Sequence, residues 1–315
     1  MVETVAGRGV ERSLDNRNIV LSGNTYAVIS MVLWASGFPA AELLLDQWHP
    51  IALMAARLAM ALLVLVPLWL VLDGVRSLHQ ARWGRGLWIG AVGFGTGTNL
   101  LLFAQWYTDP VTVALIATTT PISATLIEVW NRQRRLNQRF VLGLMISVFG
   151  GIVAIGGSLS FDFGWGVLLA ITSGFCFTWA SNAAVRDLPD LTPTGRSTVT
   201  FVGAALITFA VFFGAWSMGW AAFPIVTDPN QIGLLGIYAI AAMALSQILF
   251  IASVGKLGIA LTSLHLNIAP LYLMIILVVL GGAWDWRAVI GASIVGLGVL
   301  LSQRRTRPQR ADGRV

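Results

Sequence analysis

Apolar stretches of about 20 residues alternate with short polar breaks along almost the whole chain. A helix that crosses a bilayer satisfies its backbone hydrogen bonds internally, whereas the period-two alternation of a membrane β-barrel is absent here. The pattern therefore predicts an all-α integral membrane protein with ten transmembrane helices. The expected spans are 24–44, 51–72, 86–106, 111–130, 140–157, 164–184, 197–218, 232–254, 258–280 and 285–302.

The ten spans divide into two copies of a five-helix unit. Shifts of 143 to 149 residues align short motifs of the first half with motifs of the second. The aligned positions are 34–38 with 177–181, Pro50 with Pro193, 117–121 with 266–270, and Gly143 and Gly150 with Gly291 and Gly298. Because five is odd, the second copy enters the membrane upside down. Inverted five-helix repeats are typical of secondary transporters, whose solute site lies near the midplane.

This division predicts four segments along the chain. They are a cytoplasmic tail at 1–23, a first five-helix repeat at 24–157, a second repeat at 158–302 and a basic cytoplasmic tail at 303–315. Residues 1–20 are polar and hold no apolar signal segment, so we expect the first span to be its own insertion signal.

The charges fix an orientation. All but two of the 20 Lys and Arg residues fall in the tails and the even-numbered breaks, and the exceptions are Arg57 and Arg287. Basic loops stay on the cytoplasmic side, so both termini are expected to be cytoplasmic in an inner (plasma) membrane. The basic residues behind the net charge of +6 then lie at span ends, where they meet anionic head groups of the lipid bilayer. Nucleic acid is not an expected partner.

Cofactor chemistry has little support in the composition. The lone Cys176 lies inside a predicted span, which excludes a disulfide framework and a Cys-based metal site. No metal and no cofactor are expected.

The glycines at 90–97 favour close helix contact, since a phosphate-binding loop would follow a strand. Glycine-rich spans five and ten offer a contact surface for a homodimer.

The motifs resemble the EamA-type members of the drug/metabolite transporter superfamily, over almost the whole chain. The segments that carry the resemblance are 33–38, Pro50 with Arg57, 119–121, 269–270, and Gly291 with Gly298. The resemblance implies a secondary transporter, often an exporter, of amino acids, other small metabolites or drugs. It also implies alternating access around a cavity enclosed by spans one to four and six to nine. Relatives commonly carry Gly-Glu after spans four and nine. In this chain neither position holds that Glu.

Arg57 and Glu42 are the first candidates for chemistry. Arg57 lies about 7 residues into span two, and Glu42 lies near the same outer end of span one. Ionisable side chains inside a span are costly, and pairing lowers that cost. We expect the two to form a gating or substrate-binding charge pair. A purely structural ion pair or a snorkelling arginine is the alternative.

His265 is the candidate for proton coupling. It lies inside span nine, and an imidazole titrates in the physiological range. A hydrogen-bonded buried imidazole is the structural alternative. Glu42 is a comparable candidate, and Glu128 is a weaker one because it lies near the cytoplasmic end of span four.

Polar and aromatic side chains near the midplane are the expected substrate-binding set. Amides in the bilayer centre bond either to other helices or to a solute, and rings offer their faces to aromatic or cationic groups. The alternative is packing between helices. The set is Trp34, Asn99, Thr118, Thr119, Trp179, Gln247, Asn267 and Tyr272.

Together these features predict a secondary active transporter of a small organic solute, an exporter coupled to protons. An importer or facilitator of the same fold is the alternative. An integral membrane enzyme acting on a lipid-linked substrate would need clustered His, Asp or Glu at a membrane face, and a channel would need charge rings or a filter loop. The sequence shows neither, so no enzyme activity is expected.

Overall fold

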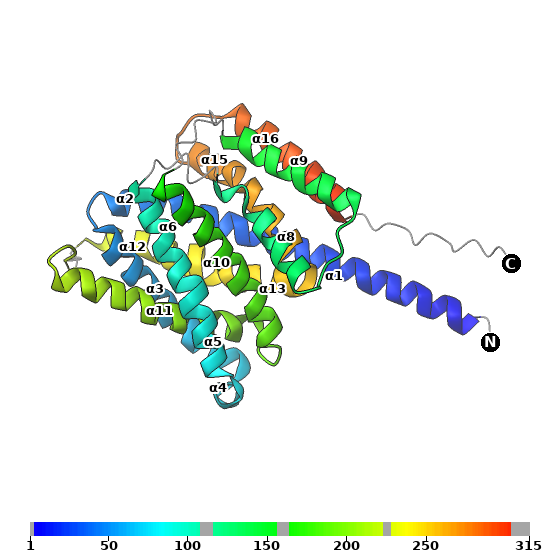
Figure 1. Cartoon of the computed structure of the whole chain (residues 1–315), viewed down its shortest axis with the longest axis horizontal. Coiled ribbons are helices and arrows are strands. Elements are labelled where there is room, and N and C mark those ends of the chain that lie inside the picture. Colours follow the sequence, from blue (N-terminus) through cyan, green and yellow to red (C-terminus); the bar gives the residue numbers. More distant parts are fainter. Residues whose placement is uncertain (1–2, 108–115, 156–163, 223–227, 304–315) are drawn as a thin grey trace.

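The computed structural model describes residues 3–107, 116–155, 164–222 and 228–303, and within these ranges every regular element is a helix (Figure 1). Eight helical segments in this part of the chain are long and apolar enough to cross a membrane. They are Arg17–Leu45, Pro50–Asp73, Trp83–Ala104, Trp165–Asp187, Pro193–Ser217, Pro229–Leu257, Ile259–Val279 and Trp286–Gln303. The chain is thus a helical, multi-pass membrane protein, as the sequence predicts.

The eight segments match eight of the ten predicted spans. The other two are the spans predicted at 111–130 and 140–157. Residues 108–115 lie outside the described part, and the first of these spans is seen from Ile116 and as helix α8 (Thr120–Trp130). The second is α9 (Gln138–Ile155), a shorter apolar helix.

The remaining helices follow the predicted order with additional breaks. They are α1 (Glu3–Ala35), α2 (Gly37–Leu45), α3 (Pro50–Asp73), α4 (Arg76–Gln80), α5 (Trp83–Ile89), η1 (Gly90–Gly95), α6 (Thr96–Tyr107), α10 (Trp165–Asp187), α11 (Pro193–Ser217), α12 (Pro229–Gly236), η2 (Ile237–Leu245), α13 (Ser246–Leu257), α14 (Ile259–Ser263), η3 (Leu264–Ile268), α15 (Ala269–Val279) and α16 (Trp286–Gln303). Helix α1 begins at Glu3, so it already runs through the segment predicted as a tail.

Prolines interrupt spans four and nine at equivalent places. Helix α8 begins at Thr120, next to Pro121, and α15 begins at Ala269, next to Pro270. Proline has no N–H to give to the preceding turn, and its fixed φ suits the first turn of a helix. Each span is therefore broken and restarted at its proline, and span nine enters the break through the 3₁₀ segment η3.

Helix lengths recur between the two halves of the chain. Helices α6 and α13 each have 12 residues, α8 and α15 each have 11, and α9 and α16 each have 18. Spans three and eight also share a π-helical segment, η1 in the first and η2 in the second. Each pair is offset by nearly the same number of residues as the sequence motifs.

Helices α9 and α16 lie side by side with their backbones in contact (Figure 1). A Cβ on Gly298 would lie 2.6 Å from the carbonyl oxygen of Gly143, and one on Gly291 would lie 2.5 Å from that of Gly150. The glycines of spans five and ten therefore pack against each other within one chain.

Helices of the two sequence halves interleave. Helix α1 packs on α13 and α15, whereas α10 packs on α6 and α8. A serine hydroxyl links each pair of helices. Ser30 Oγ of α1 donates to the Ser246 carbonyl of α13 at 2.7 Å, and Ser173 Oγ of α10 donates to the Gly97 carbonyl of α6 at 2.7 Å. We call α1 with α13, α14 and α15 the α1 bundle, and α6 with α8 and α10 the α10 bundle.

Candidate substrate pathway

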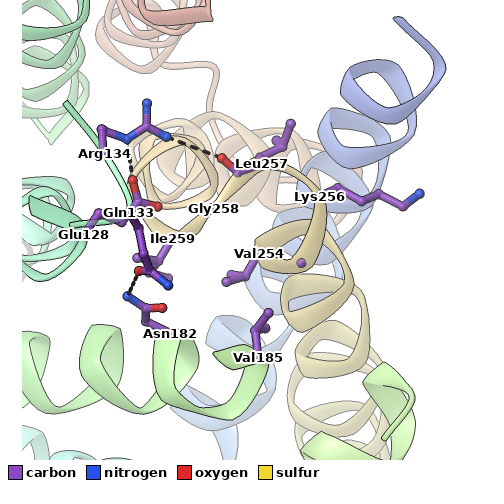
Figure 2. Close-up of a pocket in the computed structure, with 11 residues that line it drawn as sticks. Glu128, Gln133, Arg134, Asn182, Val185, Val254, Lys256, Leu257, Gly258 and Ile259 are labelled. Atoms are coloured by element: carbon purple, nitrogen blue, oxygen red, sulfur yellow. Dashed lines mark hydrogen bonds and ion pairs between the residues drawn. The ribbon is translucent and has the colours of Figure 1, made fainter. Parts of the chain in front are cut away.

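A pocket of about 340 Å³ lies where the two bundles meet (Figure 2). The α10 bundle and the loop after α8 supply one wall, and the turn between α13 and α14 supplies the other. Its volume suits a small organic molecule. The lining residues are Glu128, Gln133, Arg134, Asn182, Val185 and 254–259.

Glu128 is the buried carboxylate of this pocket, with 3% of its surface exposed. Its Oε1 accepts a hydrogen bond from the backbone N–H of Ala260 at 3.0 Å, and its Oε2 pairs with the guanidinium of Arg134. A buried charge is tolerated when it is paired and hydrogen-bonded, and both conditions hold here. The Glu128 carboxylate of the α10 bundle thus binds the backbone of the α1 bundle.

Arg134 reaches the same turn by a second route. Its Nη2 donates to the Leu257 carbonyl at 3.4 Å, and its guanidinium lies 4.6 Å from the ring centre of Phe140. The loop that carries Arg134 is held to α10, because Asn182 Nδ2 donates to Gln133 Oε1 at 2.8 Å (Figure 2). The side chain of Lys256 points away from these groups, towards α1 (Figure 2).

Sequence reasoning did not identify Gln133, Arg134 and Asn182 as pocket residues. Gln133 and Arg134 lie in one of the basic breaks, whose arginines indicate orientation in the membrane. The glycine at position 258, directly after span eight, is a feature of the sequence that relates to the pocket. Its backbone adopts φ +83°. A Cβ at that position would lie 2.3 Å from Glu128 Oε1, so glycine is required for the close approach.

Two residues of the predicted binding set, Trp34 and Tyr272, come together in one apolar cluster. Trp34 also packs edge-to-face on Phe38, with ring centres 4.9 Å apart. Val254 and Ile259 belong both to this cluster and to the pocket lining, so the cluster lies directly against the pocket. The cluster comprises Met31, Trp34, Ala124, Phe177, Val185, Phe250, Val254, Ile259, Leu266 and Tyr272.

Trp179 lies in a different cluster. It packs against a cluster of buried residues from α3, α5, η1, α10, α11, η2 and α13, and this cluster includes Phe94 and Phe201. Sequence spacing had grouped it with Trp34 as a ring that could face a solute. In the structure the two tryptophans belong to separate apolar clusters.

The three predicted amides are buried in separate places. Asn99 Nδ2 donates to the Gly95 carbonyl at 2.8 Å, and Asn267 Nδ2 donates to the Ser147 carbonyl on α9 at 3.2 Å. Two buried amide atoms have no hydrogen-bond partner within the described residues, Gln247 Nε2 and Asn267 Oδ1. Buried polar groups of this kind are suited to a bound solute or water.

Thr118 and Asn267, which the predicted repeat makes equivalent, do come together. A Cβ on Gly151 would lie 3.1 Å from both Thr118 Cβ and Asn267 Cγ, so both side chains pack on α9. The neighbouring Thr119 donates its hydroxyl to the Ile116 carbonyl at 2.6 Å. All three residues therefore lie beside the proline breaks of spans four and nine.

Arg57 and Glu42 do not pair with each other. Arg57 Nε donates to the Tyr238 carbonyl at 3.0 Å and Nη2 to the Ala242 carbonyl at 3.4 Å, while its guanidinium stacks 3.7 Å above the Tyr238 ring. Glu42 is exposed. Backbone carbonyls of the π-helical segment η2 and an aromatic face satisfy the cation, so it needs no carboxylate.

His265 is buried in η3, with 3% of its surface exposed. Its Nδ1 lies 3.3 Å from the Leu261 carbonyl oxygen. The side chain is therefore buried within span nine, between the 257–260 turn and the proline break along the chain.

Helices that cross a membrane, arranged as two bundles with a solute-sized pocket between them, define a multi-pass membrane transporter. Residues 21–156 match the EamA-like transporter family. The chain is 26% identical over 276 residues to an uncharacterized transporter, YyaM, of Bacillus subtilis (strain 168), covering 84% of this chain and 87% of YyaM. The match over residues 21–156 and the similarity to YyaM confirm the resemblance to EamA-type transporters of the drug/metabolite transporter superfamily.

A solved crystal structure has the same fold. It superposes with a TM-score of 0.73 over 91% of this chain and 96% of the other chain. At 18% sequence identity, this likeness concerns the fold alone.

Proposed function

We propose that this transporter is a secondary active carrier that works by alternating access between two inverted five-helix repeats. The observation that carries the proposal is the pairing of α9 with α16. Gly143 corresponds to Gly291 in the repeat and Gly150 corresponds to Gly298, yet Gly143 contacts Gly298 and Gly150 contacts Gly291. Equivalent helices therefore run antiparallel, as an inverted duplication requires.

The proline breaks support the same mechanism. They interrupt spans four and nine at equivalent residues, Pro121 and Pro270, and the residues beside them include the buried Thr118 and Asn267. Broken helices at membrane depth are tolerated where they are buried in protein or line a cavity. We place the solute site between these breaks and the apolar cluster that contains Trp34 and Tyr272.

The cargo is a small organic solute, such as an amino acid or another small metabolite or drug. Trp34 and Tyr272 supply ring faces, and Gln247 supplies an unpaired amide donor. We propose export as the direction and proton coupling through His265. The arginine bias supports a plasma-membrane location with both termini cytoplasmic.

Purified protein in proteoliposomes tests this function. A thermal-shift screen against amino acids, nucleosides, vitamins and quaternary amines should reveal a stabilising solute, because a ligand that binds the folded state raises its apparent stability. Labelled solute of that class should then show counterflow, in which unlabelled solute on the far side drives uptake of label. Flux without counterflow would indicate a channel and contradict the carrier proposal.

A further inference from the structure

The two bundles are fastened to each other beside the pocket. Helix α8 packs on α14, and two hydrogen bonds cross from the α10 bundle to the backbone of the α1 bundle. Glu128 accepts the first from Ala260, and Arg134 donates the second to Leu257. The ion pair between Glu128 and Arg134 holds both side chains in place for these contacts.

The backbone of the 257–260 turn allows Glu128 and Arg134 to approach it closely. Gly258 has φ +83°, a conformation that side chains with a Cβ rarely adopt, and it faces Glu128 Oε1. The loop bearing Arg134 is also tied to α10 through Asn182 and Gln133. Arg134 therefore moves with the α10 bundle, and any separation of the bundles must break the contacts at 257–260.

We propose that Glu128, Arg134 and the 257–260 turn form the cytoplasmic gate of the transport path, closed in this structure. This inference rests on the proposed alternating-access function. Val254 and Ile259 lie between the pocket and the aromatic cluster around Trp34. Opening the gate joins the pocket to that cluster and gives a solute a route from the cytoplasm to the interior.

The strength of the contact suits a gate. The side chain of Glu128 is 4% exposed and that of Arg134 is 19% exposed, so loss of Arg134 leaves a buried carboxylate uncompensated. Among the described residues, two hydrogen bonds cross between the bundles at this point, and both end on backbone atoms. The ion pair itself stays within the α10 bundle, so the gate can open and close without separating two buried charges.

Cysteine accessibility tests the gate without any knowledge of the solute. In a Cys176→Ser background the chain has no other cysteine, and Ala124→Cys places a reporter one turn before Glu128 at a position with 0% exposure. Glu128→Gln should raise labelling by a membrane-impermeant maleimide from the cytoplasmic face by about tenfold, which corresponds to ~1.4 kcal/mol. Inverted and right-side-out vesicles report the two faces separately.

Two matched controls separate the gate from general effects of charge and strain. Asp190→Asn removes the same charge from an exposed pair with Arg82 and should leave labelling unchanged. Gly258→Ala should raise labelling as Glu128→Gln does, because its Cβ meets the Glu128 carboxylate. Gly74→Ala imposes a similar φ (+74°) with no atom within 4 Å of the new Cβ and should have no effect.

Thermal unfolding and gel filtration establish that each variant is folded, and Met31→Cys, buried in the same cluster, is the second reporter. Unchanged labelling in folded Glu128→Gln and Gly258→Ala would overturn the gate. Faster labelling only from the outer face would overturn its cytoplasmic assignment. Counterflow measured on the unmodified chain tests the carrier function separately, since labelling needs no transport.

Discussion

At the scale of single residues, this chain holds buried charge through the backbone as well as through ion pairs. Arg57 is satisfied by two carbonyls and a ring, and Glu128 by a backbone N–H together with Arg134. Sequence spacing correctly singled out Arg57 as an unusual residue in a span. It could not identify the partners, because carbonyls freed by a π-helical segment leave no mark in the side-chain sequence.

Replacing Arg57 with lysine should weaken the contact between α3 and η2. Lysine keeps the charge but loses the planar group that reaches two carbonyls and stacks on Tyr238, so the free energy of unfolding should fall by about 2 kcal/mol. Thermal unfolding in detergent measures this. Glu42→Gln is the companion variant and should change stability by less than about 0.5 kcal/mol. Equal losses in both, with no further loss in the double variant, would show that the two residues pair after all.

Gln247 offers a test of solute contact at one residue. Its buried Nε2 has no partner among the described residues, so Gln247→Leu removes an unpaired donor and should leave stability within about 1 kcal/mol of the parent. A solute held by this amide should bind about tenfold more weakly. Thermal shifts with and without the solute identified by screening separate these effects. A large loss of stability without solute would mean that the amide supports the fold instead.

His265 is the residue on which proton coupling depends in our proposal. His265→Gln should abolish the pH dependence of transport between about pH 5 and 8, where an imidazole changes charge. His79→Gln, at an exposed position on the short helix α4, is the matched control and should keep the parent profile. Solute uptake into proteoliposomes at a series of pH values measures both variants. Full pH dependence in folded His265→Gln would exclude this residue as the coupling group.

At the scale of helices, small residues and prolines decide how spans pack and where they break. The α9/α16 contact depends on glycines because the two backbones approach within the space of a Cβ. Motif spacing aligned these glycines, and the segments that end at Pro121 and Pro270, between the two halves of the chain. Which helix each glycine face meets depends on tertiary packing, so the sequence pattern alone did not identify α9 and α16 as neighbours of each other.

Gly291→Ala should separate α9 from α16. The new Cβ would meet backbone atoms of Ala154 and Gly150 at about 2.5 Å, and overpacking of this kind costs about 1–3 kcal/mol. Gly296→Ala lies on the same helix with no atom within 4 Å of the new Cβ, so higher helix propensity should leave it equally or more stable. Thermal unfolding of the two variants gives the comparison. Equal stability of both would mean that the backbones are not in contact.

At the scale of the whole molecule, contacts of α16 with α1 and with α9 join the two sequence halves at one end of the structure. Asn24 and Gln303 exchange side-chain hydrogen bonds of 2.6 and 3.1 Å, so the end of α16 lies beside α1. Gly143, near the start of α9, lies beside Ser302. The structure therefore puts Asn24 of α1, the 131–139 loop and the end of α16 at one end of the molecule. This is the face that the arginine bias assigns to the cytoplasm.

Cysteine labelling of intact cells and inverted vesicles tests this topology. Cysteines at Arg135 and in the tail after Gln303, each in a Cys176→Ser background, should react only from the cytoplasmic face. A cysteine at Trp284 should react only from outside, because it precedes α16 at the opposite end of that helix. If Arg135 and the tail were labelled from opposite faces, the number of crossings between them would be odd, and an inverted duplication of five helices could not describe the chain. Agreement at all three positions would fix the face from which Glu128 and Arg134 close the path.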